Sequence, residues 1–376
     1  MTRGPQLDLV LVGGGLANGL LASRLCATRP ELSFVLLEAG PSLGANHTWS
    51  FHGTDVTAAQ RKWLEPMCSM NWHTHEVKLP GVSRTIGGGY HTIRSPDFDR
   101  HLREELKDRV RTNARVAEVA ATHVVLANGE RLEAKAVIDG RGTNLQFPCG
   151  YQKFLGQDLI LDRPHGITQP LLMDATVDQI DGYRFIYVLP WSDTHLLVED
   201  TYYSNGPELN LPVVRERIAA WVAAQGWTIA SVVREEFASL PIPVGGDPPS
   251  FDRPVIGVAA GLFHATTGYS LPFAADVAER ICAATDLSAP ALTAMLSEVS
   301  RRHWESQGFF RVLNRMMFRG AKPEERVRIF SSFYKHDDGV IARFYAGKLS
   351  FTDKLQAMRR GVGTMPALTA LKAALS

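Results

Sequence analysis

Three consecutive glycines, Gly13, Gly14 and Gly15, stand between an apolar run and a stretch with helical periodicity. Glycine has no β-carbon, so its backbone can approach a pyrophosphate closely, and amide groups at a helix N-terminus point toward the negative charge. Glu38 follows the next apolar run, where an acidic residue typically binds a ribose hydroxyl pair. The spacing predicts a dinucleotide site, and the alternative is a tight glycine turn in an ordinary α/β fold.

The elements that must position this site are short and apolar. Residues 7–12 and 34–37 are predicted to be buried parallel strands, and residues 16–27 are predicted to form the helix between them. A strand–turn–helix–strand unit of this kind places the glycines at the helix N-terminus. Leu16 and Ala17, in the first helical turn, therefore join the expected cofactor contacts.

Two later glycine turns favour FAD over a nicotinamide dinucleotide. Residues 136–142 have the pattern of an apolar strand and a polar turn, which in two-domain flavoproteins returns the chain beside the dinucleotide. Residues 266–270 precede a helical stretch, 273–284, whose N-terminus can hold the negative charge of a reduced flavin ring. Each segment alone also fits an ordinary loop, but their order along one chain favours a flavoprotein. The expected contacts are Asp139, Gly140, Arg141, Thr267, Gly268, Tyr269 and Ser270.

Two adjacent carboxyl groups, Glu199 and Asp200, lie in the second strand of a predicted antiparallel hairpin. Residues 183–189 and 195–202 are rich in aromatic and β-branched side chains, and residues 191–193 form the turn. Side chains alternate along a strand, so only one of the two carboxyls can face a flavin, unless a bulge intervenes. A structural role for both, with one paired to an arginine, is the alternative.

The composition is that of an ordinary globular chain. Of the 376 residues, 45% are hydrophobic and 21% are charged, and the formal net charge is +1. No long block of Lys and Arg occurs, which disfavours a nucleic-acid partner. The four cysteines are far apart in sequence, which argues against a metal site or a disulfide framework and fits a reducing compartment. No apolar run approaches the roughly 18 residues that span a bilayer, and no signal-peptide pattern is present.

From Leu292 onward the pattern is mostly helical, and one stretch is basic on a single face. Arg311, Arg315 and Arg319 recur every four residues, with apolar side chains mostly opposite. A basic amphipathic helix can lie in a membrane interface. A helix packed on the core, with solvated arginines, fits the pattern equally well.

Together these patterns predict an α/β fold: a Rossmann-type FAD-binding domain, an inserted antiparallel-sheet substrate domain and a helical C-terminal region. The FAD-binding domain is expected at residues 1–150 and again at residues 246–290. The substrate sheet is expected at residues 151–245, with an amphipathic helix at residues 211–224. Residues 291–376 form the helical region, a candidate for membrane contact.

Six strings of this sequence resemble the bacterial FAD-dependent lycopene beta-cyclases and occur in the order of that family. The resemblance runs from about residue 8 to about residue 355, and His264-Ala265 departs from the family's His-Pro. The first string adds His47, Thr48 and Trp49 to the expected cofactor contacts. The strings are Asn46–Phe51, Met173–Asp178, Tyr183–Phe185, Glu199–Thr201, Thr266–Pro272 and Arg343–Leu349.

The resemblance implies that the protein isomerises a linear carotene. Family members close the ends of lycopene into β-ionone rings, giving gamma-carotene and then beta-carotene, with no atoms gained or lost. They need reduced FAD without a net redox change, and NAD(P)H is the expected electron source. Resemblance and position make Glu199 the acid that protonates an alkene carbon, which requires burial to raise its pKa. Asp200 is the second catalytic candidate, and orientation of Tyr202 is its alternative role.

The substrate also predicts where the enzyme works. At about 0.8 kcal/mol per buried methylene, moving a forty-carbon polyene from lipid to water costs on the order of 20–30 kcal/mol. We therefore expect a peripheral enzyme on the cytoplasmic face of the membrane that takes lycopene or related linear carotenes from lipid. Two alternatives share the scaffold: a redox flavoenzyme, such as a monooxygenase or a reductase acting on a hydrophobic polyene, and a membrane-bound flavin-binding protein without catalysis. The aromatic residues that either line a polyene tunnel or belong to the core are Tyr183, Phe185, Tyr187 and Trp191.

Overall fold

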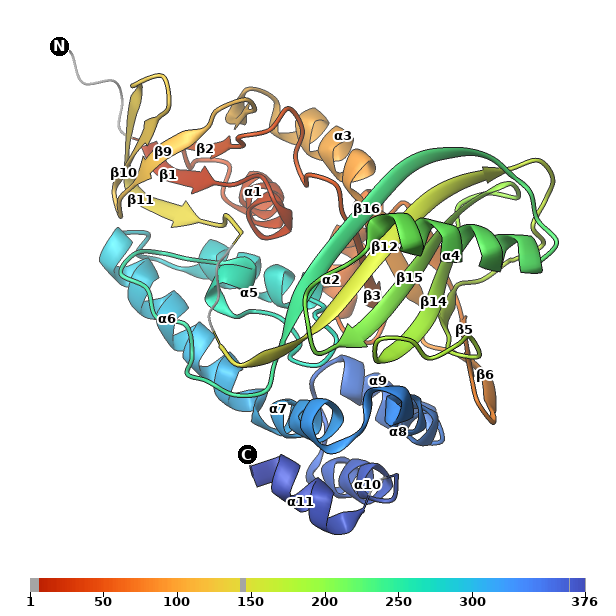
Figure 1. Cartoon of the computed structure of the whole chain (residues 1–376). Coiled ribbons are helices and arrows are strands. Elements are labelled where there is room, and N and C mark those ends of the chain that lie inside the picture. The colour runs from red at the N-terminus through yellow and green to blue at the C-terminus, as the bar shows by residue number, and fades with distance from the viewer. Residues whose placement is uncertain (1–6, 143–146, 365, 376) are drawn as a thin grey trace.

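The computed structural model describes residues 7–142, 147–364 and 366–375 of the chain. In Figure 1, the region with the glycine run lies at the upper left, a long and mostly antiparallel sheet lies at the right, and the last helices lie below. Within the described ranges, no helix is both long enough and apolar enough to cross a bilayer.

The glycine run directly follows β1, a strand of a six-stranded sheet with the order β8-β2-β1-β11-β10-β9. The first unit is confirmed as predicted: β1 spans Leu7–Val12, α1 spans Leu16–Thr28 and β2 spans Phe34–Leu37. β1 pairs in parallel with β2 and with β11 (Arg131–Asp139). Parallel strands are buried on both faces, which is why their residues form apolar runs. The other strands are β8 (Val110–Arg111), β9 (Val116–Val119) and β10 (His123–Leu126).

The predicted hairpin is the centre of a seven-stranded sheet with the order β16-β12-β15-β14-β13-β5-β6. β14 and β15 are antiparallel, with Tyr187 opposite Glu199, so the hairpin is confirmed. The sequence analysis does not predict the long strands β12 and β16, or the recruitment of β5 and β6. The strands are β5 (His75–Leu79), β6 (Val82–Ile86), β12 (Cys149–Leu161), β13 (Leu171–Asp174), β14 (Tyr183–Pro190), β15 (His195–Ser204) and β16 (Ile229–Pro243).

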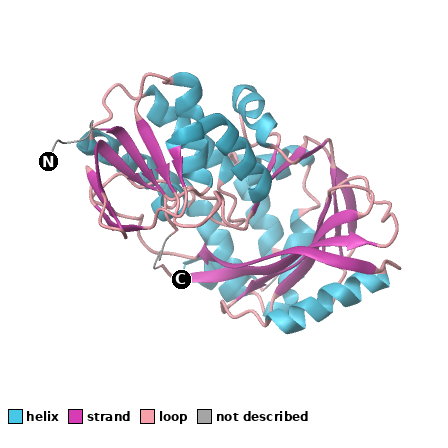
Figure 2. Ribbon diagram, turned by 90° about the horizontal axis from the view of Figure 1, so that it is seen from above, coloured by secondary structure: helices cyan, strands magenta, loops and turns pink. Residues whose placement is uncertain are grey.

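The two faces of this sheet have different neighbours. α4, at Leu211–Ala224 as predicted, covers the outer face, where Ile218 packs with Leu196 and Val198. The residues of β15 between these, such as Leu197, point to the inner face. There they pack in a second core with side chains of the C-terminal helices. Figure 2 shows the two large sheets as separate groups of strands, with helices packed between and around them.

A third, three-stranded sheet with the order β3-β7-β4 contacts the inner face. Ser50 Oγ lies 3.1 Å from Tyr187 Oη, and Thr48 Oγ1 donates to Glu236 Oε2 at 2.9 Å. β3 therefore connects the nucleotide region with the long sheet. The strands are β3 (Thr48–His52), β4 (Met70–Trp72) and β7 (Tyr90–Arg94).

The C-terminal third is helical, as predicted, and packs on the inner face of the long sheet. The ring of Phe330 on α8 stacks on Tyr183 of β14, with ring centroids 3.8 Å apart. α5 instead shares the core of the first region with α1 and α3. The remaining α-helices are α2 (Ala58–Leu64), α3 (Ser95–Leu106), α5 (Leu271–Ala283), α6 (Ala289–Ser306), α7 (Gly308–Arg315), α8 (Arg326–Phe333), α9 (Asp338–Tyr345), α10 (Phe351–Val362) and α11 (Ala367–Leu375).

α7 packs on the core through Phe310, as one interpretation expects, and its Arg311 and Arg315 are half-buried with backbone carbonyl partners. Contact of this helix with a membrane stays a prediction. Arg311 donates to the carbonyl oxygen of Trp304 at 2.6 Å, and its guanidinium lies 4.4 Å from the Trp304 ring. Arg315 donates to the carbonyl oxygens of Val244 at 2.8 Å and Ala374 at 2.7 Å. Sequence periodicity groups such side chains on one face but does not reveal what covers that face.

Candidate active site

A groove of about 500 Å³ lies beside the carboxyl ends of β1, β2 and β11. The sequence analysis misses part of its wall, including Ala45, Ala114, Arg115 and Gly257, because these residues carry no motif. Their positions depend on the fold rather than on local pattern. The predicted cofactor residues that line the groove are Gly13, Gly15, Leu16, Ala17, Glu38, His47, Trp49, Gly140, Arg141 and Ser270.

The glycine run has the shape of a phosphate cradle. Gly13 has φ +93°, and a Cβ there would lie 3.1 Å from the Arg141 backbone nitrogen. A Cβ on Gly15 would meet no atom within 4 Å, so the chain is open to the groove where α1 begins. Gly14 does not line the groove, but its amide donates to Glu38 Oε2 at 2.7 Å and so holds that carboxylate at the rim. A dinucleotide pyrophosphate therefore fits this cradle.

Two predicted cofactor residues, Thr48 and Asp139, do not line the groove and bind protein side chains instead. Thr48 Oγ1 donates to Glu236, as described above, and accepts from Arg234 at 2.8 Å. The Asp139 carboxylate binds the guanidinium of Arg141 at 2.9 and 2.8 Å. Asp139 thus orients Arg141, which does line the groove.

The loop before α5 is fixed by a buried histidine. His264 Nδ1 accepts the amide hydrogens of Thr266 and Thr267, each at 3.2 Å. Its Nε2 lies 2.9 Å from a carbonyl oxygen at the end of α9, so Nε2 carries the hydrogen. Burial lowers the pKa of His264 to about 3, which keeps the ring neutral. Ala265, where the resemblance leads us to expect proline, donates its amide to Gln307 at 3.0 Å, so the loop is held without a proline.

The other predicted residues of this loop, Thr267 to Ser270, do not all face the groove. Ser270, at the N-terminus of α5, lines the groove. Thr267 instead lines a separate apolar cavity. Tyr269 Oη lies 2.9 Å from Tyr90 Oη, and Gly268 has φ +72°, a conformation that favours glycine. The structure thus brings only Ser270 of these four predicted residues to the groove wall.

Asp200 lies on the outer face, in a closed set of polar contacts. Arg184 donates to its two carboxylate oxygens at 2.8 and 3.0 Å, and Tyr202 Oη donates to it at 2.7 Å. The Asp200 side chain is completely buried. These partners satisfy the hydrogen-bonding capacity of the carboxylate and favour a structural role for Asp200. The contact with Tyr202 fits the alternative role, in which Asp200 orients Tyr202.

Glu199 lies on the opposite, inner face, as strand alternation predicts. Its Oε1 accepts a hydrogen bond from Thr201 Oγ1 at 2.5 Å. Burial, and then the charge of Glu236, raise the pKa of Glu199 to about 8. The side chain is therefore a neutral carboxylic acid at neutral pH, which is the form that can donate a proton.

Glu236 on β16 is a polar residue of the inner face that the sequence analysis misses. It is buried, and its Oε2 accepts from Arg234 Nη1 at 2.9 Å. Arg234 also binds Asp158 at 2.7 Å, and Trp191 donates to the other oxygen of Asp158 at 2.8 Å. One sequence feature could have pointed to Glu236. Glu235 and Glu236 are adjacent carboxyl residues in a strand-like run, as are Glu199 and Asp200.

The aromatic residues predicted to line a tunnel lie on the inner face. Tyr183 and Phe185 are buried in its core, and Tyr187 and Trp191 pack against that core. Tyr187 Oη lies 3.0 Å from Tyr90 Oη, which links the sheet to the loop before α5 through Tyr90. These side chains form a wall near Glu199, since Tyr187 stands directly opposite it in the sheet.

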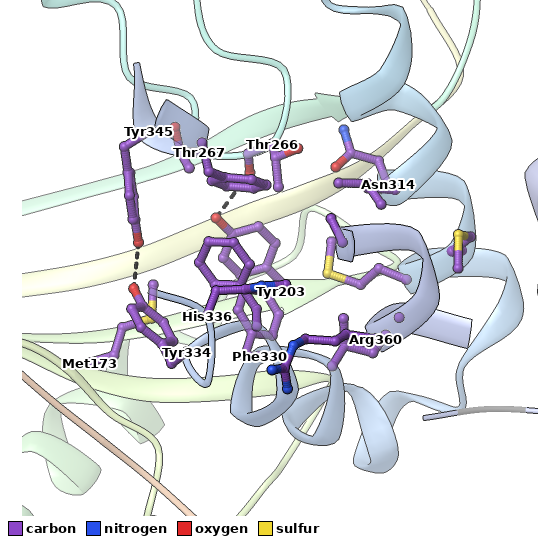
Figure 3. A pocket seen from close by; sticks show the side chains of 18 residues that line it. Met173, Tyr203, Thr266, Thr267, Asn314, Phe330, Tyr334, His336, Tyr345 and Arg360 are labelled. Carbon is purple, nitrogen blue, oxygen red and sulfur yellow. Dashed lines mark hydrogen bonds between the residues drawn. The ribbon is translucent and has the colours of Figure 1, made fainter. Parts of the chain in front are cut away.

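A narrow apolar cavity of about 80 Å³ lies between the inner face and the C-terminal helices (Figure 3). On the sheet side, the hydroxyl of Tyr203 donates to the carbonyl oxygen of Thr266 at 3.0 Å. Phe330 of α8 and Arg360 of α10 lie on the helix side. Glu199 does not line this cavity in the described part of the chain, but Tyr203 shares its face of β15.

The fold is similar to that of several solved structures. One similar structure is a geranylgeranyl bacteriochlorophyll reductase-like protein from Thermoplasma acidophilum, with a TM-score of 0.58, 14% identity and 98% of each chain covered. Another is a tryptophan halogenase from Shewanella frigidimarina, with a TM-score of 0.60, 10% identity, and 100% and 96% of the two chains covered. The predicted fold class is confirmed as an α/β fold of FAD-dependent oxidoreductases and halogenases.

The sequence comparison is more specific. The lycopene beta-cyclase of Pantoea ananas is 42% identical over 378 residues, which cover 99% of both chains. Residues 8–373 match the family described as lycopene cyclase protein. The match includes the glycine cradle, Glu199 and most of the helical region, so the predicted resemblance is confirmed: this chain belongs to the lycopene cyclase family.

Proposed function

We propose that this protein is a lycopene beta-cyclase that isomerises the linear ends of lycopene to β-ionone rings, giving gamma-carotene and then beta-carotene. The full-length similarity to a bacterial cyclase supports the substrate. The observation that carries the chemistry is Glu199, a buried carboxyl group on the inner sheet face with a pKa of about 8. Alkene protonation needs a neutral carboxylic acid in a dry site, and Glu199 has these properties.

In the proposed reaction, the O–H bond of Glu199 breaks and its proton adds to a terminal alkene carbon of the substrate. This leaves a carbocation in the polyene and a carboxylate on Glu199. A neighbouring double bond attacks the cation and forms the new carbon–carbon bond. The Glu199 carboxylate then takes a proton from a carbon next to the new cation, which restores a double bond and returns Glu199 to its acid form. One proton is added and one is lost, so substrate and product have the same mass. The buried surroundings of Glu199 keep out water that would capture the cation.

Reduced FAD is the cofactor that we propose for the groove. The open backbone at Gly15 and the Arg141 side chain would hold the pyrophosphate, and Glu38 would hold a ribose. When bound and reduced, the flavin supplies fixed negative charge that stabilises a nearby cation without a net redox change. The N-terminus of α5 at Ser270 lines the groove and favours that charge. We expect NAD(P)H to be the electron source.

The competing function is a redox flavoenzyme, such as a monooxygenase or a reductase acting on a hydrophobic polyene, because the fold also occurs in a reductase-like protein. Anaerobic incubation with lycopene in liposomes and chemically reduced FAD separates the two. A cyclase gives a cyclic product of unchanged mass, with many turnovers for each reduced flavin. A product that gains oxygen or hydrogen, with one reductant consumed per product, would support the redox function instead.

We also propose that the protein works as a peripheral enzyme on the cytoplasmic face of the membrane, because its substrate dissolves in lipid. Its docking face is formed by α10 and α11, which lie together at the lower end of the molecule in Figure 1. Four large apolar side chains are exposed there: Phe351 (75%), Leu355 (55%), Leu368 (65%) and Leu371 (57%).

The charge of this docking face fits an anionic lipid surface. Asp353 is the only acidic residue from position 351 to the C-terminus, and it is buried in an ion pair with Arg343. The basic residues on the two helices are Lys354, Arg359, Arg360 and Lys372. Exposed apolar side chains with basic neighbours are typical of helices that lie in a membrane interface.

The docking face also adjoins the apolar cavity, which offers a route for the substrate. Arg360 and Gly361 of α10 line the cavity, and Thr266 and Thr267 of the loop before α5 line it on the other side (Figure 3). A volume of about 80 Å³ is too small for a polyene end, so we propose that the cavity widens between the sheet and the C-terminal helices when a substrate enters.

A further inference from the structure

The inner face of the seven-stranded sheet carries a second buried carboxyl group that the proposed reaction leaves unused. Glu199 on β15 and Glu236 on β16 both stand opposite Gly156 on β12. Directly opposed residues share a face of the sheet, and two strand spacings separate the outer backbones by about 10 Å. A Cβ on Gly156 would lie 3.4 Å from Glu199 Oε2 and 3.4 Å from Glu236 Cγ, so both side chains extend over the glycine.

The two carboxyl groups have different electrostatic partners. Glu236 accepts hydrogen bonds from Arg234 and from Thr48, each at 2.9 Å. Glu199 accepts one from Thr201 and has no ion-pair partner within the described ranges. Burial raises the pKa of both groups. At Glu236 the charge of Arg234 opposes this effect and that of Asp158 adds to it, while at Glu199 the charges of Glu236 and Asp200 add to it and that of Arg234 opposes it. Glu236 has a guanidinium and a hydroxyl as donors, which favour its anion, whereas Glu199 has a hydroxyl alone and so favours the proton.

We propose that Glu236 is a positioning residue for cyclisation: it is the fixed anion across Gly156 that keeps Glu199 in its acid form. The inference rests on the proposed function, in which the proton of Glu199 starts the reaction. Two carboxylates that share a buried site resist ionising together, so an anionic Glu236 makes the proton of Glu199 harder to lose to solvent. Gly156 makes this arrangement possible because it has no side chain between the two groups.

Glu236→Gln tests the proposal, and Glu235→Gln is its matched control. Glu235 carries the same charge but lies on the opposite face, where it binds Arg215 and Gln157. We expect E236Q to shift the alkaline limb of the pH–rate profile for cyclisation to lower pH by about one unit. The cyclisation rate should then fall by about fivefold near pH 8 and remain almost unchanged near pH 6. E235Q should keep the wild-type limb. An unmoved limb in E236Q, or an equal loss at both pH values, overturns the proposal.

An infrared titration separates failure of this proposal from failure of the proposed function, because it needs no substrate. The FAD-loaded protein should show a protonated carboxyl band that is absent from Glu199→Gln and that titrates near pH 8. In E236Q this band should titrate at a lower pH. If E236Q does not fold, Glu236→Asp, which withdraws the anion by one methylene, should give a smaller shift in the same direction. A band that titrates at the wild-type pH in these variants overturns the proposal, whether or not lycopene is cyclised.

Discussion

Glu199 and Asp200 are neighbours in sequence, yet their surroundings give them different chemistry. Asp200 accepts hydrogen bonds from a guanidinium and a phenol, which satisfy its two oxygens. Burial and the nearby anion of Glu236 favour the neutral form of Glu199, and its one hydroxyl donor, Thr201, opposes them. The difference follows from strand alternation, because adjacent residues of β15 meet different layers of the molecule. Residue type alone therefore does not identify the acid.

Replacement of Glu199 with glutamine tests the acid directly. The amide has nearly the same shape but no acidic proton, so we expect cyclisation to fall by about 100-fold or more. FAD affinity should be unchanged, because Glu199 does not line the groove. In the wild type, the rate should fall as the pH rises through about 8, where the donor form is lost. Anaerobic product assays across the neutral and alkaline range measure both effects. Near-normal cyclisation by Glu199→Gln with FAD bound would mean that another group is the acid.

Asp200→Asn should destabilise the protein rather than inactivate it. The change leaves the buried Arg184 charge without its anion, which typically costs about 3–5 kcal/mol of unfolding free energy. Urea unfolding of the FAD-loaded protein measures the loss, and activity per folded molecule should be retained. The double variant Arg184→Met with Asp200→Leu removes both charges and should recover much of the stability. A stable Asp200→Asn protein that no longer cyclises would show that Asp200 acts in the reaction.

At the scale of elements, the docking face makes a prediction about α10 and α11. Phe351→Glu with Leu371→Glu should weaken binding to liposomes that contain anionic lipid by about tenfold or more, since burial of one large apolar side chain contributes about 1.5–3 kcal/mol. Cyclisation of detergent-dispersed lycopene should be retained. Co-sedimentation measures binding. Val233→Glu with Phe237→Glu on β16 is the matched control, because each side chain is 60% exposed but lies on another element. Loss of binding in the control alone would place the membrane contact at β16.

The elements that the sequence predicts correctly are those with a strong local pattern. The runs at β1 and β2, the hairpin of β14 and β15, and helix α4 each show the apolar period of their own structure. The prediction fails where pairing partners are distant. β16 alternates weakly because it is an edge strand with much of one side exposed, and Glu236 is missed with it. The environment of Arg311 is likewise set by Trp304 and not by its own helix.

At the scale of the whole molecule, the groove is assembled from segments that are far apart in the chain. Gly15 and Leu16 come from the first unit, Ala114 and Arg115 from the edge of the first sheet, and Ser270 from the loop before α5. The fold brings these segments together, and each contributes one part of the groove wall. A ligand that fills the groove therefore stabilises contacts across most of the first region.

FAD should consequently stabilise the folded protein. Substitution of one residue in the groove should remove this stabilisation without changing the stability of the apoprotein. At a free concentration 100-fold above its Kd, a ligand that binds only the native state adds about 2.7 kcal/mol. Gly15 has φ −76° and ψ −177°, which valine tolerates, and a side chain there meets no protein atom within 4 Å but projects into the groove. Gly15→Val should therefore leave the stability of the apoprotein almost unchanged and abolish the stabilisation by FAD.

Thermal unfolding with and without added FAD measures that difference. Gly87→Val is the matched control, because Gly87 is exposed and a Cβ there also meets no atom within 4 Å, but it does not line the groove. This control should respond to FAD like the wild type. If FAD raised the unfolding temperature of Gly15→Val as much as that of Gly87→Val, the pyrophosphate would have to bind elsewhere.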